Sequence, residues 1–159
     1  MKRWIPAVCL TTITAVFIGC SGVTGLDNDP AFRPMIGKVL RTKKDLVVMD
    51  FKGSKKALAL HIPGTSGVPE LKDIPTQLPS NYYGHMVYGV FPTGGMLTVA
   101  HVEKVTSVEF SFIDVYATVT SEGKFRGQRL DIGILTNQKT GVPTFDAEFL
   151  DEIPVPSGK

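Results

Sequence analysis

The histidines are the first residues of this chain to consider for chemistry. His61, His85 and His101 are its only histidines, and none stands at metal-ligand spacing with another histidine or a carboxylate. A zinc or iron site typically needs three or four converging ligands. His101 and Glu103 share a strand face and would approach such a site only if His61 came alongside. We therefore expect surface or hydrogen-bonded histidines, and no metal or other cofactor.

Catalytic groups are equally sparse. No serine stands in a G-x-S-x-G elbow, and both cysteines lie within the first 20 residues. Asp114 and Asp131, on strands that we expect to be adjacent, are conceivable as the carboxylate pair of a glycoside hydrolase. Asp131 alternates with core residues, however, and is expected to face solvent. The glycine-rich turns 64–67 and 93–95 lack a following helix that would cradle a phosphate. The sequence therefore predicts no catalytic residues and a protein that is not an enzyme.

A tyrosine cluster is the best candidate for binding. Tyr82, Tyr83 and Tyr88 stand close to His85 in the sequence, and tyrosine is enriched at protein interfaces. The segment 63–85 before them is long for a connection in a compact domain. Its four prolines lower the entropic cost of ordering it. The segment is thus predicted either to contact a partner or ligand or to form an ordered cover over one end of the fold.

The N-terminal segment carries a different kind of chemistry. Two basic residues precede an apolar run from Trp4 to Ile18, and Gly19 and Cys20 close it. A charged start, an apolar run and a small residue before the cut make a secretory signal peptide. The run is shorter than the roughly 20 residues that a spanning helix needs. Cleavage before Cys20 would remove Cys9 and leave no partner thiol for a disulfide.

The stretch Phe17-Ile18-Gly19-Cys20 resembles the lipobox of bacterial lipoprotein precursors. This resemblance implies that Cys20 carries a diacylglyceryl thioether and an N-acyl group such as palmitate, and becomes the first mature residue. Stable anchoring takes more than one acyl chain, and three would hold the domain at a membrane. Ser21 resembles the pattern that is carried to the outer membrane of diderm bacteria. The implied location is the outer membrane, facing the periplasm.

Charge excludes one class of partner. The 17 basic residues exceed the 15 acidic ones by two, and Lys2 and Arg3 account for that excess. The mature chain would therefore be neutral, and we expect no nucleic-acid partner. Arg33 to Lys56 carries eight basic residues, whereas 146–152 is acidic. The basic stripe is predicted either to rest on anionic headgroups or to form a solvated hairpin whose lysines guard an edge strand.

Short β-type segments follow residue 36. We expect strands over 37–42, 46–51, 57–62, 86–91, 96–105, 108–120 and 127–136. The residues 144–153 fit either a short helix or a final strand. Within 108–120 the apolar residues change parity, which predicts a bulge or sharp bend near Ile113 and Asp114. In the next strand Leu130, Ile132 and Ile134 are expected to face inward.

The segment 37–42 and the turn 89–95 before a strand are similar to small SH3-like β-barrel domains. This resemblance implies an all-β fold, a small SH3-like antiparallel β-barrel, with an OB-like barrel as the alternative. The predicted organisation is a signal peptide (1–19), a lipidated flexible tether (20–35), one barrel domain (36–153) and a C-terminal tail (154–159).

The resulting functional hypothesis is a membrane-anchored, non-catalytic binding module. Its partner would be an envelope protein, peptidoglycan or a toxin; the alternative is an envelope hydrolase or its accessory subunit. An enzyme should show a cleft where at least two polar catalytic groups converge. A binding module should show an apolar patch near Tyr82 and Tyr83.

Overall fold

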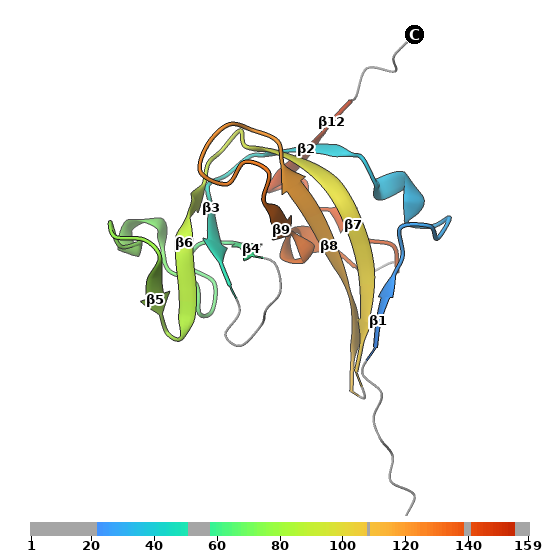
Figure 1. Cartoon of the computed structure of the whole chain (residues 1–159), viewed down its shortest axis with the longest axis horizontal. Coiled ribbons are helices and arrows are strands. Elements are labelled where there is room, and N and C mark those ends of the chain that lie inside the picture. The colour runs from blue at the N-terminus through green and yellow to red at the C-terminus, as the bar shows by residue number, and fades with distance from the viewer. Residues whose placement is uncertain (1–21, 51–57, 108, 139–140, 155–159) are drawn as a thin grey trace, which may run out of the picture.

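The fold was analysed in a computed structural model that describes residues 22–50, 58–107, 109–138 and 141–154. The predicted signal peptide, Cys20, and the tail beyond Pro154 lie outside these residues. Within them the chain is all-β, as predicted (Figure 1). No helix of the described part is long and apolar enough to cross a bilayer.

Ten strands form one sheet in the order β12-β2-β7-β8-β9-β4-β3-β6-β5, with β1 added beside β7. The strands of this sheet are β1 (Gly22–Gly25), β2 (Val39–Thr42), β3 (Leu46–Met49), β4 (Leu58–His61), β5 (Ser80–Tyr82), β6 (His85–Phe91), β7 (Met96–Thr106), β8 (Ser111–Val119), β9 (Arg129–Asp131) and β12 (Leu150–Ile153). A separate pair joins β10 (Thr136–Asn137) to β11 (Thr144–Phe145). Three short 3-10 helices complete the described chain: η1 (Arg33–Met35), η2 (Leu71–Asp73) and η3 (Gly133–Leu135).

The large sheet is not a closed antiparallel barrel. Its end strands β12 and β5 do not pair with each other in the described chain, and β4 runs parallel to β9. The expectation of closure is therefore wrong, because the path of hydrogen-bonded strands stays open. The narrower SH3-like or OB-like type stays a prediction.

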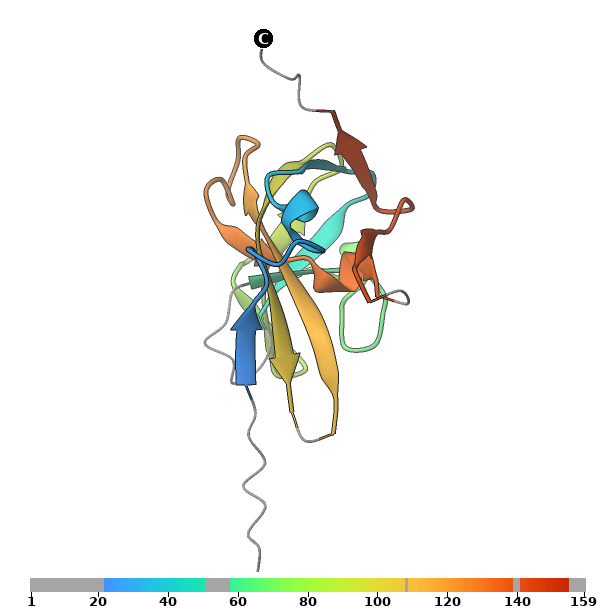
Figure 2. The same cartoon turned by 90° about the vertical axis from the view of Figure 1, so that its right-hand side faces the viewer.

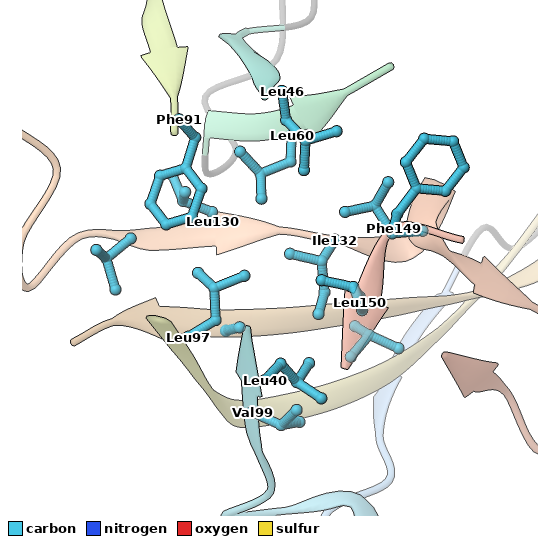
Figure 3. Close-up of a cluster of buried hydrophobic side chains, with 14 of the residues drawn as sticks. Leu40, Leu46, Leu60, Phe91, Leu97, Val99, Leu130, Ile132, Phe149 and Leu150 are labelled. Carbon is cyan, nitrogen blue, oxygen red and sulfur yellow. The ribbon is translucent and has the colours of Figure 1, made fainter. Parts of the chain in front are cut away.

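The inner face of this sheet holds the main core (Figure 3). Leu60 on β4 is closed to solvent there and Leu58 packs against the same cluster, whereas Ala59 and His61 lie on the opposite, outer face. The alternation predicted for this strand is confirmed. The main core unites side chains that are far apart in the sequence: Leu40, Leu46, Leu97, Val99, Val115, Leu130, Ile132, Phe149 and Leu150 among others.

A second, smaller core lies on the outer face of β3 and β6. Val47, Met49 and Val87 from these strands pack there against Val68 from the long loop. Three more side chains of the loop and β5 cover the cluster: Ile74, Leu78 and Tyr82. The long segment is therefore an ordered cover, as one of its two predicted roles has it, but it covers the outer face of β3 and β6 and not one end of a barrel.

The β7–β8 hairpin corrects the predicted bulge. β8 passes through Ile113 and Asp114 in regular register. The irregularity lies in β7, where Ala100 is the extra residue between Val99 and His101. The apolar parity changes for another reason, because the hairpin extends beyond the core and its far end has no interior to face (Figure 2).

The strand predicted over 127–136 ends early. β9 stops at Asp131, and its carboxylate Oδ1 accepts the backbone N–H of Gly133 at 2.7 Å. This side-chain hydrogen bond favours a turn over a continued ladder. η3 then buries Leu135 and leaves Ile134 half exposed, so the inward orientation predicted for Ile134 is wrong. The residues 144–153 form strands β11 and β12 and no helix.

The segment predicted as a tether is packed on the domain from Gly22 onward. β1 pairs with β7, and Phe32 and Met35 are buried in the main core. The turn-forming residues of this segment suggested a spacer, but its few apolar side chains suffice to dock it.

The basic and acidic segments pair with each other. β2 and β12 are antiparallel neighbours, and Lys38 contacts Glu152 at 2.7 Å. The next pair along the strands joins Arg41 to Asp151 at 3.3 Å. The described part of the basic stripe is thus largely neutralised, which leaves little charge for anionic headgroups.

Candidate functional site

The outer face of β4, β8 and β9 is hollowed. A cavity of about 470 Å³ lies there, with a mostly apolar lining that includes Ala59, Phe112 and Ile134. A smaller hollow of about 150 Å³ adjoins it and shares His61 and Ile134 with it. We call the two together the outer groove. It runs from β8 across β4 to the long loop.

Two carboxylates converge in the outer groove. On β9, Asp131 pairs with Tyr116 of β8 on one side and with Ala59 of β4 on the other. Asp114 lies two residues before Tyr116 on β8 and therefore on the same face of the sheet. A Cβ placed on Gly133 would lie 3.1 Å from Asp131 Oδ1 and 3.7 Å from Asp114 Oδ1. Asp131 lies on the outer face, away from the main core as expected, where it is half-buried and lines the cavity.

His61 lies at the junction of the two hollows. It is buried, and burial lowers the pKa of its imidazole, with a further lowering from the nearby His85. His61 is therefore neutral at neutral pH. The wall of the groove combines an apolar surface, a neutral imidazole and two carboxylates.

The four binding residues predicted from the sequence are dispersed. Tyr82 packs into the second core, and Tyr83 contacts its ring edge-on at the exposed tip of the β5–β6 hairpin. His85 lines the smaller hollow. Tyr88 packs against the main core, and its hydroxyl donates to Asp50 Oδ2 at 3.2 Å. Of the four, only His85 reaches the outer groove.

Tyr83 and Gly84 form the two-residue turn of that hairpin. Both have a positive φ, 47° and 88°, as a type I′ turn requires. The amide of Gly84 donates to Asn81 Oδ1 at 3.1 Å. The position of Tyr83 in the tyrosine cluster is therefore explained by the turn that it forms.

A second polar cluster holds the N-terminal segment to β7. His101 contacts Asp27 Oδ2 through Nδ1 and Glu103 Oε2 through Nε2. The other oxygen of Asp27 accepts the amide of Val102 at 2.8 Å. Burial alone would raise the pKa of Asp27, but the hydrogen bonds from Val102 and His101 outweigh it and lower that pKa. The cluster thus fastens the chain after β1 to the sheet.

This cluster extends across β8 to β9. Tyr116 donates to Glu103 Oε1 at 2.9 Å, and the guanidinium of Arg129 lies 4.5 Å from its ring centre. Burial and the bond to Glu103 raise the pKa of Tyr116 well above its ordinary value. Three strand spacings, about 14 Å, separate the strands of His61 and His101, and His61 also lies two residues beyond Ala59, which is level with His101. His61 is therefore too far away to serve as a third metal ligand beside His101 and Glu103. No group of three side chains in the described part of the chain is arranged to hold a metal.

Sequence reasoning missed Phe112 and Ile134, the exposed apolar residues of the outer groove. Phe112 shares parity with Asp114 on β8, which is the signal that could have placed both on the outer face. A comparison with known protein families, curated proteins and solved structures finds no match for this chain.

Proposed function

We propose that this protein is a lipid-anchored lipoprotein of the bacterial outer membrane, facing the periplasm, which binds an envelope protein without catalysis. The observation that carries the proposal is the outer groove. Its larger hollow has the volume of a ligand site and a mostly apolar wall with a few convergent polar groups. The location rests on the lipobox resemblance at Cys20.

The chemistry of the outer groove specifies what would bind there. Phe112 and Ile134 offer an apolar contact, and Asp114 and Asp131 offer negative charge a few ångströms away. An apolar side chain next to a lysine or arginine complements both features. We therefore expect an exposed segment of this composition on the partner protein.

A second candidate function, an envelope hydrolase, rests on the convergence of Asp114 and Asp131. A pair of carboxylates is the minimum equipment of a glycoside hydrolase. However, Asp131 Oδ1 is already engaged by the amide of Gly133 and supports the turn into η3. A structural role therefore accounts for the position of this carboxylate, and binding is the simpler function.

The test is recovery of a partner from detergent-solubilised envelopes by tagged Cys20→Ala protein. One stoichiometric envelope protein is expected, and its recovery should fall at least about tenfold with Ile134→Asp, since a charge would enter both hollows. The matched control is Leu71→Asp, an exposed leucine outside the groove. Equal recovery by both variants contradicts the groove as the binding site.

Two further readouts separate the alternatives. Retention by purified sacculi, with no protein recovered, would favour peptidoglycan as the partner. Cleavage of sacculi that is lost in Asp114→Asn would favour the hydrolase. Release of the Cys20→Ala protein from the membrane fraction tests the anchor, and its continued retention would contradict lipidation of Cys20.

A further inference from the structure

The far end of the β7–β8 hairpin is unusual for an exposed surface. β7 and β8 pair from Leu97 and Val119 out to Thr106 and Ser111, and this long hairpin projects from the rest of the sheet (Figures 1 and 2). Phe110 is 57% exposed and Phe112 36% exposed, with ring centres 5.7 Å apart. Contact of clustered aromatic side chains with water is unfavourable, and such an exposed patch marks a surface that a partner or a membrane covers.

β1 adds a third strand to this end. Val23 pairs with Val105, and Val105 pairs with Phe112, so the three side chains form one row across three strands. Val23 is 59% exposed. Together with Phe110 this row is the hairpin tip. It is apolar, and the nearby exposed charges, Lys104 and Glu109, balance each other.

The chain itself indicates what covers the tip. Gly22 opens β1 opposite Thr106, near the tip, and Cys20 precedes it by only two residues. Two residues span at most about 7 Å. If the acyl chains on Cys20 enter a bilayer, the hairpin tip is brought to the level of its headgroups.

We propose that the hairpin tip inserts Phe110 and Val23 into the interface of the membrane that holds the Cys20 acyl chains, while Phe112, which lines the outer groove, stays outside the bilayer. The inference rests on the proposed lipid anchor. It adds a second contact, which fixes the orientation of the domain. Phenylalanine and other apolar side chains are suited to the boundary between headgroups and acyl chains. Because β12 and the paired charges on β2 lie at the other end of the molecule (Figure 1), they would point away from the bilayer.

The single tryptophan of the chain makes this testable. Trp4 lies in the segment that signal cleavage would remove, so Phe110→Trp would give the mature protein a single tryptophan, which can be excited apart from its four tyrosines. The purified lipidated protein is reconstituted in phosphatidylcholine vesicles with brominated acyl chains. We expect severalfold stronger quenching by bromine than for the control Leu71→Trp, which lies in the loop over β3 and β6. Val23→Trp provides a second fluorophore at the tip.

The outcomes of this experiment separate the tip from the anchor. Vesicle flotation reports anchoring, and quenching reports the depth of the tip. Flotation with tip tryptophans quenched no more than the control would overturn the inference and leave the anchor intact. Cys20→Ala protein that floats as well as the wild type would refute the anchor, and with it the reason for the tip to meet the bilayer.

Discussion

The inner face of β4, β8 and β9 is apolar, whereas the outer face mixes apolar with ionisable side chains, although the residues of the two faces alternate along the same strands. Leu60, Val115 and Leu130 are closed to solvent on the inner face. Their immediate neighbours on the outer face are His61, Asp114 and Asp131, which line the outer groove. A register shift of one residue would exchange the two sets. The inner face therefore fixes the register, and the register in turn assembles the groove.

The largest expected effect comes from the inner face. Leu60→Ala should lower the free energy of unfolding by about 3 kcal/mol, because a fully buried leucine leaves a cavity. Ile134→Ser, on the outer face, should change it by less than about 0.5 kcal/mol. Equilibrium unfolding in urea measures both. Similar losses for the two variants would break the distinction between a stabilising face and a binding face.

The second core gives the next effect. Val87→Ala should cost about 2 kcal/mol, since two buried methyl groups are lost under the long loop. The loss should be local, with faster amide hydrogen exchange over 63–79 and little change at Leu97 or Val115 in the main core. Uniform acceleration throughout the sheet would instead show that the two cores open as one unit.

The sequence predicted most strands because a strand that faces one core alternates. Leu58, Leu60 and Ile62 alternate with Ala59 and His61, and the structure has that arrangement. β3 is different. Its four residues, Leu46–Met49, are all buried because both of its faces are covered, and such a run carries no information on which side is which. The existence of two cores was therefore not predictable from this strand.

The outer groove could not be predicted for a different reason. It depends on the parallel pairing of β4 with β9 across about 70 residues of chain, and no local pattern encodes a nonlocal pairing. The tyrosines stood close in the sequence, but the bulge in β6 beside Val48 and Met49 sends Tyr88 to the inner face and leaves Tyr82 on the outer one. Proximity in sequence was a poor guide to a shared surface.

The polar cluster around His101 and Tyr116 also stabilises the fold, by a smaller amount than the cores. Tyr116→Phe should lower the free energy of unfolding by about 1 kcal/mol, because Glu103 Oε1 loses the hydroxyl donor in a half-buried network. Tyr88→Phe is the matched control; Tyr88 is less buried than Tyr116 and its hydroxyl bond to Asp50 is longer, 3.2 Å, so a smaller loss is expected. If Tyr116→Phe has no effect in urea unfolding, the polar cluster contributes no stability.

The smallest effect is the contribution of His61 to the pH dependence of stability. Burial lowers the pKa of His61 in the folded protein below its ordinary 6.5. As the pH falls below 6.5, His61 becomes protonated in the unfolded chain before it does so in the folded protein. The free energy of unfolding therefore falls as the pH falls.

At pH 6 this loss is at most about 0.8 kcal/mol. His61→Gln should flatten the stability curve between pH 7 and pH 6, measured as the shift in urea midpoint relative to the wild type. An unchanged slope in the variant would mean that another group titrates, and that His61 takes up a proton as readily in the folded protein as in the unfolded chain. A charged His61 beside Asp114 and Asp131 would cancel part of the negative charge that the proposed partner needs, so this small effect bears directly on the chemistry of binding.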